Sequence, residues 1–292
     1  MIESFLKHLR HEKRLSGHTL TAYQNDLRQF HQFLSDHHPS VDISATDHIT
    51  IRLWIVYLIE QGLEPVSVNR KVACLRRFYK YLLTEGVIVT DPMSRVQALK
   101  TKKRLPHFVQ EEHMVKLLDN LDFPDTFEGL RDRLILEVLY GTGIRLSELI
   151  QLRDENIDLR QRTMKVLGKR NKERVIPFPL SLVSLIEQYR LVRNRDVGSK
   201  RGTLFVRNNG EPCYPTLVYK VVRRHLAALP SLEQRSPHVL RHTYATHLLD
   251  RGAELNAVKD LLGHTSLAAT QVYTHNSLDK LRKVFEQAHP KA

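Results

Sequence analysis

An arginine directly after a glycine-rich turn is the first residue of this sequence whose position suggests chemistry. Residues 139–149 read LYGTGIRLSEL, in which Gly141-Thr142-Gly143 is typical of a helix end and Arg145 stands where a new helix begins. Glu148 falls in the first turn of that helix, where a carboxylate complements the helix dipole. The junction would hold the Arg145 guanidinium in one place, although an arginine after a glycine turn is often an ordinary surface residue.

A second arginine lies at the start of a predicted helix, in the segment 236–249, SPHVLRHTYATHLL. Ser236 can cap the helix and Pro237 can occupy its first position. His238 and Arg241 are three residues apart, so both side chains lie on one face of the first turns. Free backbone N–H groups and the helix dipole favour an anion there. The segment therefore predicts a binding site for a negatively charged group.

Two histidines of this segment, His238 and His242, have the spacing of four that some zinc sites use. In the HExxH zinc motif a glutamate follows the first histidine, whereas here that position holds Val239. Arg241, between the two histidines, would also repel a divalent cation. We therefore expect no metal at this site.

A basic turn lies between two β-prone stretches in residues 166–177, VLGKRNKERVIP. The pattern predicts a hairpin whose tip, residues 169–172, carries Lys169 and Lys172. A mobile hairpin could lower a lysine into a site, and a lysine can donate a proton where an arginine cannot. Charges at a hairpin tip also protect a sheet edge from aggregation, so this segment alone leaves both interpretations open.

A histidine and a tyrosine follow in residues 261–275, LLGHTSLAATQVYTH. Gly263 predicts a helix end, His264 stands directly after it, and a further short helix would present Tyr273. A single tyrosine near the end of a chain is ordinarily a core or surface aromatic. A functional role for Tyr273 is supported because this segment follows the other three segments in order along the chain.

The elements that must position these residues fall into two parts. In residues 1 to about 95, apolar residues recur at helical spacing and predict four helices, of which the fourth starts at Pro65 and stops at Gly86. The polar, basic segment 101–108, TKKRLPHF, is typical of an interdomain linker. The remaining sequence predicts helices near 110–121, 127–140 and 181–195, β-rich pieces around 155–176, a strand at Thr203–Val206, and helices to the end. We expect a mainly α chain with a small antiparallel β-sheet, an α+β fold.

The composition indicates a polyanionic partner. The 292 residues include 45 Lys and Arg against 32 Asp and Glu, a formal charge of +13, which favours nucleic acid. No apolar run approaches the roughly 18 to 20 residues that span a bilayer, and no signal-peptide core is visible, so no membrane partner is expected. Cys74 and Cys213 lack a second thiol at metal-ligand spacing and fit a reducing, cytoplasmic setting.

The predicted fourth helix carries a row of basic residues that could contact DNA phosphates. We expect such contacts from Arg70, Lys71, Arg77 and Lys80, together with Lys172 of the hairpin tip. A charged helix face that merely meets solvent is the alternative.

Taken in order, six residues resemble the catalytic signature of the tyrosine recombinase (phage-integrase-like) family: Arg145, Lys169, His238, Arg241, His264 and Tyr273. The resemblance covers essentially the whole chain and is strongest to the Xer type. It implies a helical, SAM-like core-binding domain that binds DNA over residues 1–100, a linker at 101–108, a catalytic domain over 109–277, and a C-terminal helix over 278–292 that a neighbouring subunit could receive.

The resemblance implies an enzyme, a DNA strand transferase that needs no cofactor. Tyr273 would attack the scissile phosphate, which gives a 3'-phosphotyrosyl link and a free 5'-hydroxyl and leads through a Holliday junction. Arg145 and Arg241 would hold the non-bridging oxygens, because forked guanidiniums suit that charge better than ammonium groups. Lys169 would protonate the leaving 5'-oxygen and His238 would handle the tyrosine proton.

The family further implies assembly on double-stranded DNA with a pseudo-palindromic core site. Two molecules would bind each site and four would form the synapse, as a homotetramer or a heterotetramer with a paralogous Xer recombinase, with a DNA translocase as an activator. The two domains would close on the duplex as a C-shaped clamp. The expected role is the resolution of chromosome or plasmid dimers at cell division.

Three other functions stay open on the sequence alone. A mobile-element integrase of simple architecture would share every motif. A type IB topoisomerase would use much the same chemistry as a monomer that relaxes supercoils. A DNA-binding architectural protein would keep the fold without catalysis, and the intact signature argues against it.

Overall fold

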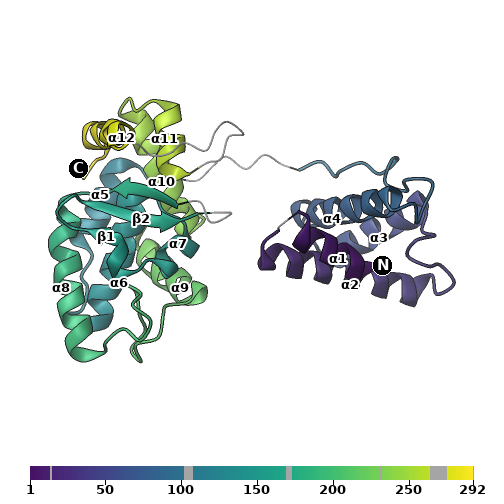
Figure 1. Ribbon diagram of the computed structural model, residues 1–292, viewed down its shortest axis with the longest axis horizontal. Helices are drawn as coiled ribbons and strands as arrows, with labels where there is room; N and C mark the ends of the chain where they lie inside the picture. The colour runs from purple at the N-terminus through teal and green to yellow at the C-terminus, as the bar shows by residue number, and fades with distance from the viewer. Residues whose placement is uncertain (14, 102–107, 169–172, 230–231, 264–274, 292) are drawn as a thin grey trace. The chain divides into compact units, whose positions relative to one another are not determined.

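The computed structural model describes residues 1–13, 15–101, 108–168, 173–229, 232–263 and 275–291, with backbone alone for residues 275–280. The chain divides into two compact units, Met1–Arg104 and Leu105–Ala292. Mostly helical segments and one small antiparallel sheet make up the described residues (Figure 1), which confirms the predicted fold class. The predicted domain boundaries and the clamp stay predictions.

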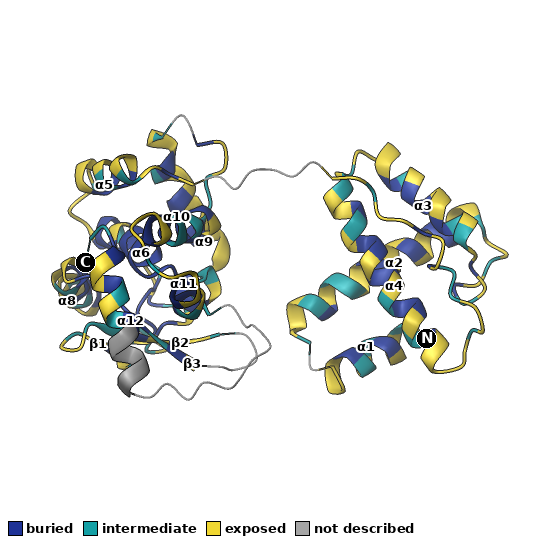
Figure 2. Ribbon diagram, turned by 90° about the horizontal axis from the view of Figure 1, so that it is seen from above, coloured by how far each residue is buried: buried dark blue, intermediate teal, exposed yellow. Residues whose placement is uncertain are grey.

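The described residues of the first unit form four helices: α1 (Ile2–His11), α2 (Gly17–His37), α3 (His48–Glu60) and α4 (Pro65–Thr84). The starts of α2, α3 and α4 have local causes, because Ser16 accepts a hydrogen bond from the Thr19 backbone, Asp47 accepts one from the Thr50 backbone, and Pro65 opens α4. Their inward faces are buried (Figure 2), and large aromatic side chains such as Trp54 lie in the core of this unit.

The second unit is built around α6 (Phe127–Thr142), whose residues are almost all buried (Figure 2). Both α8 (Ser181–Asp196) and α10 (Pro237–Asp250) pack against it. The remaining elements are α5 (Glu111–Asn120), α7 (Leu146–Gln151), η1 (Asp154–Asn156), α9 (Pro215–His225), η3 (Leu226–Ala228), α11 (Leu255–Leu262) and α12 (His275–Ala288).

A three-stranded antiparallel sheet runs in the order β1 (Ile157–Asp158), β2 (Thr163–Leu167) and β3 (Glu173–Pro177). The β2 and β3 strands pair from Thr163 opposite Pro177 to Leu167 opposite Glu173. The predicted hairpin is therefore present in its strands, and its tip, residues 169–172, lies outside the described residues.

The predicted strand at Thr203–Val206 is wrong. Its two ends form isolated bridges with different segments, Thr203 with Arg153 and Val206 with Pro212. A ladder needs consecutive pairs with one partner, and this segment instead buries Leu204 and Phe205 in the core. The segment is buried because it is apolar, but no neighbouring strand pairs with it along its length.

The C-terminal helix α12 packs on its own unit, against α10, α11 and β3. Leu281 and Phe285 are buried there, and Lys291, just beyond the helix, forms ion pairs with Asp119 and Glu137. The helix begins at His275, three residues before the predicted segment. None of the helices among the described residues combines the length and the apolar character that a membrane span requires.

Candidate active site

Arg145 stands between two helices whose ends fix its backbone. Gly143 ends α6 in the left-handed region at φ +61, and a Cβ there would lie 2.4 Å from Cδ1 of Tyr244, so only glycine fits. Arg145 is then the N-cap residue of α7, and its backbone N–H donates to Oε2 of Glu148 at 2.7 Å. Its Nη1 donates to Oε1 of the same carboxylate at 2.8 Å.

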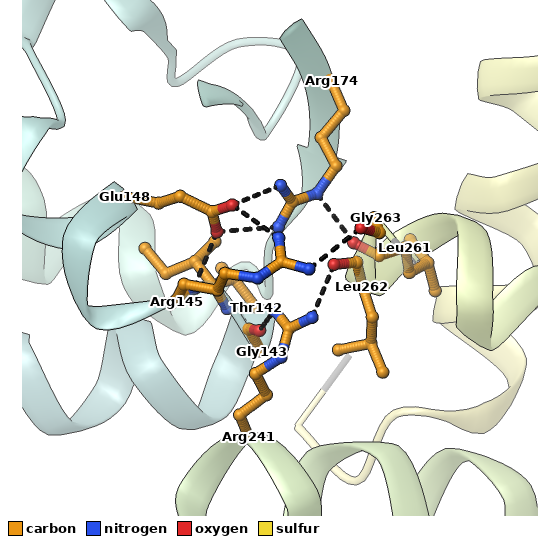
Figure 3. A network of polar contacts seen from close by, with 10 residues as sticks. Thr142, Gly143, Arg145, Glu148, Arg174, Arg241, Leu261, Leu262 and Gly263 are labelled. Atoms are coloured by element: carbon orange, nitrogen blue, oxygen red, sulfur yellow. Dashed lines mark hydrogen bonds and ion pairs between the residues drawn. The ribbon is translucent and has the colours of Figure 1, made fainter. Parts of the chain in front are cut away.

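Glu148 is the centre of a buried ion-pair network (Figure 3). The guanidinium of Arg174, on β3, donates to both of its oxygens, Nη1 to Oε1 at 2.7 Å and Nη2 to Oε2 at 2.9 Å. Burial by itself would raise the pKa of Glu148, but the hydrogen bonds and charge of Arg174, then the bonds from Arg145, outweigh it and hold the pKa at about 2. The carboxylate is therefore ionised throughout the physiological range.

Arg241 reaches the same place from α10 and is 6% exposed. Its Nη1 donates to the carbonyl of Gly143 and its Nη2 to the carbonyl of Leu262, both at 2.6 Å. Burial, then the nearby charge of Arg145, lowers the pKa of Arg241 to about 10. The guanidinium thus remains charged at neutral pH, at a cost that a bound anion would offset.

Three arginines from three elements converge on the C-terminal end of α11 (Figure 3). Arg174 Nε donates to the carbonyl of Leu261 at 3.1 Å, Arg241 donates to Leu262, and Arg145 Nη2 donates to Gly263 at 2.9 Å. Carbonyl groups at a helix end lack helical partners and carry the negative end of the dipole. The arginines therefore complete this helix end.

The charges of this cluster do not balance. Three guanidiniums, those of Arg145, Arg174 and Arg241, face the single carboxylate of Glu148, so these four side chains carry a net charge of +2. The side chain of Arg145 is 26% exposed, whereas that of Arg174 is 5% exposed, so a ligand reaches the cluster at Arg145. Chemically, the cluster suits a small, multiply charged oxyanion.

Of the six residues of the predicted signature, the structure places three at or near this cluster. Arg145 and Arg241 lie in it, and His238 is exposed on α10 one turn before Arg241, where Pro237 occupies the first helical position. Ser236 is the N-cap residue, as predicted, but its side chain makes no capping hydrogen bond. Four predicted residues lie outside the described residues: Lys169, Lys172, His264 and Tyr273.

The segments that lead to those undescribed residues end at the cluster. Gly263 ends α11 in the left-handed region at φ +64, directly before His264. A Cβ on Gly263 would lie 3.0 Å from the Arg174 side chain. β3 carries Arg174 two residues after the hairpin tip.

The prediction that Lys71 contacts DNA is wrong for this structure. Lys71 is 6% exposed, and its ammonium donates to Asp26 at 2.9 Å and to Gln29 at 2.5 Å on α2. Arg70 also binds Asp26, but half of its side chain is exposed. Lys80 is exposed on the same helix, and Arg77 is partly exposed.

Arg174 is the site residue that sequence reasoning missed. One signal could have found it. Alternate residues of a strand point to the same face, so Arg174 lies on the buried face that Ile176 also occupies. A buried arginine needs a partner for its charge, which points to a nearby carboxylate.

Comparison with known proteins finds matches to the same protein family in both units. Residues 107–279 match the model of the phage integrase family, and residues 2–86 match the phage integrase N-terminal SAM-like domain. The tyrosine recombinase XerC of Staphylococcus saprophyticus is 40% identical over 290 residues, 99% of this chain and 97% of its own length. XerC of Chlorobaculum parvum is 35% identical over 100% of this chain and 94% of its own length.

Solved structures share the fold at lower identity. XerH bound to a palindromic difH substrate, a post-cleavage complex, has a TM-score of 0.74 at 23% identity, with 97% of this chain and 82% of that chain covered. The Tn1549 transposon integrase in complex with transposon right-end DNA has a TM-score of 0.72 at 20% identity, with 97% and 98% covered. This chain belongs to the phage integrase family and is a site-specific tyrosine recombinase of the XerC type, an enzyme that breaks and rejoins DNA.

Proposed function

We propose that Arg145 and Arg241 bind the non-bridging oxygens of the scissile phosphate during strand cleavage. The observation that carries the proposal is the net charge of +2 on the cluster at the end of α11. A phosphodiester carries one negative charge and gains another as an oxygen nucleophile attacks, so the cluster matches the transition state better than the ground state. The two guanidiniums supply the charge that metal ions supply in many phosphoryl-transfer enzymes.

Tyr273 is the proposed nucleophile. Its phenolate oxygen forms a bond to phosphorus, the bond from phosphorus to the 5'-oxygen breaks, and a 3'-phosphotyrosyl link results. His238 accepts the phenol proton, and Lys169 gives a proton to the departing 5'-oxygen, so protons and charge balance. Attack by the 5'-hydroxyl of a partner strand reverses these steps and conserves the bond energy. His264 adds a hydrogen bond to a non-bridging oxygen.

We further propose that the chain acts in pairs on a pseudo-palindromic core site and as a tetramer in the synapse. The palindromic substrate of the XerH complex supports two-fold binding. The tetramer contains one kind of subunit or this chain with a paralogous Xer recombinase, and a DNA translocase activates it. α12 packs on its own unit in this structure, and we propose that in the tetramer the same face, with Leu281 and Phe285, packs on a neighbouring subunit instead.

The proposed biological role is the resolution of chromosome or plasmid dimers, which the XerC names of the relatives support. The relatives named XerC, at 35% and 40% identity, do not favour the alternative of mobile-element integration, since the Tn1549 integrase shares the fold at only 20% identity. We propose that Arg70, Arg77 and Lys80 contact phosphates, since each is at least partly exposed on α4.

The test is a cleavage assay on a nicked duplex that traps the covalent product. The core site is selected from random DNA by binding to this protein, and the assay contains EDTA, with and without the paralogous recombinase of the host. We expect a protein–DNA adduct that survives SDS and disappears in Tyr273→Phe, while DNA binding is retained. Binding without an adduct in both conditions contradicts the proposed chemistry.

A further inference from the structure

We infer that Arg174 is a positioning residue of this active site: it holds Glu148, and through it Arg145, in the geometry that receives the scissile phosphate. The inference rests on the proposed function of Arg145. Arg174 lies on β3, outside the six residues of the family signature, and it is too buried to touch DNA itself.

The first argument is the geometry of the pair. Arg174 holds both oxygens of Glu148 in a bidentate contact, at 2.7 and 2.9 Å, so the carboxylate cannot rotate. The same two oxygens then accept from the backbone N–H and from Nη1 of Arg145. The direction of the Arg145 guanidinium is therefore set by a carboxylate that Arg174 orients.

The second argument is the position of Arg174 between three segments. Besides Glu148 at the start of α7, its Nε donates to the carbonyl of Leu261 at the end of α11. Its guanidinium also occupies the space beside Gly263 that a Cβ would need. One side chain of β3 thus joins the turn that presents Arg145 to the helix end that precedes His264.

The third argument is electrostatic. Without Arg174, Glu148 and Arg145 would form an ordinary one-to-one ion pair, in which the carboxylate competes with a phosphate for the guanidinium. With Arg174 bound to the same carboxylate, the charge of Glu148 is shared between two arginines, and Arg145 keeps attraction for an anionic ligand.

The test compares Arg174→Lys with Arg193→Lys, a matched control in the same unit. Arg193 is 3% exposed on α8 and binds the carbonyls of Thr203 and Leu204, which are not part of the cluster. Both substitutions keep the charge and remove the fork of a buried arginine. Adduct formation is measured on the nicked duplex at saturating protein, at a temperature where both variants are folded.

We expect R174K to slow adduct formation about 10- to 100-fold, the range for groups that orient a site residue, while R193K stays near the wild-type rate. A methylphosphonate at the scissile position carries no charge, so misplacement of Arg145 should matter less there. The rate ratio of phosphate to methylphosphonate should therefore fall in R174K and stay unchanged in R193K. In a chain that already carries Glu148→Gln, R174K should slow adduct formation by a smaller factor than it does in the wild-type chain.

The outcomes separate the two proposals. A wild-type chain that binds the core site but forms no adduct, either alone or with the paralogous recombinase, overturns the proposed function and this inference with it. A wild-type chain that cleaves, beside an R174K variant that cleaves equally fast or shows an unchanged phosphate to methylphosphonate ratio, overturns the positioning role alone.

Discussion

Replacing Glu148 by glutamine tests whether the buried carboxylate is the negative centre of the arginine cluster. The pKa of Glu148 is lowered from 4.5 to about 2, and one pKa unit corresponds to about 1.4 kcal/mol, so ionisation of this group stabilises the folded unit by about 3 kcal/mol. Because the folded pKa is depressed, this stability is present above pH 4.5 and is lost as the pH falls toward 2. The loss reaches about 1 kcal/mol at pH 4 and about 2 kcal/mol at pH 3.

Glu148→Gln should therefore destabilise the second unit by about 3 kcal/mol at pH 7, within the range for breaking a buried ion pair. The difference from the wild type should shrink to about 1 kcal/mol at pH 3, because glutamine does not titrate. The Arg241 guanidinium, with pKa lowered to about 10, keeps its charge across this range.

The assay must report on the second unit alone. The single tryptophan, Trp54, lies in the core of the first unit, so its fluorescence follows that unit and serves as an internal control. Hydrogen exchange of the amides in α6, the central helix of the second unit, gives the free energy of opening there. A difference between wild type and Glu148→Gln that stays constant from pH 7 to pH 3 would refute the assignment of this carboxylate.

Three further predictions concern other parts of the chain. Lys71→Met should destabilise the first unit by roughly 3 to 5 kcal/mol, because it leaves a buried carboxylate without one of its partners, and a urea titration followed by Trp54 fluorescence measures this. Lys80→Ala should change that stability by less than about 0.5 kcal/mol but weaken DNA binding and lower its salt dependence; unchanged binding removes Lys80 from the proposed interface. His289→Leu should flatten the acid sensitivity of the second unit: burial lowers the pKa of His289 to about 3, so the wild type loses stability as the pH falls below 6.5, by about 2 kcal/mol at pH 5. Equal pH dependence of α6 exchange in the wild type and this variant argues against that origin.

Local sequence features predicted the helix ends that frame the site. Gly143 and Gly263 both adopt the left-handed backbone at which a helix stops, and Pro237 opens α10. These outcomes follow from the conformational freedom of glycine and the fixed φ of proline, which belong to single residues. The strand Thr203–Val206 failed because pairing depends on a partner segment, and apolar content says nothing about that partner.

The sequence by itself determined which residue types are present, where helices begin and end, and the order of the motifs that identify the family. Only the tertiary structure decided which basic side chains meet solvent and which are buried. Lys71 lies three residues after Val68 and four before Leu75, so it turns inward with them, and Asp26 on α2 receives it. Arg174 meets Glu148, 26 residues away in the chain, because β3, α7 and the end of α11 pack together. A buried charge needs a partner, and the fold alone brings that partner within reach.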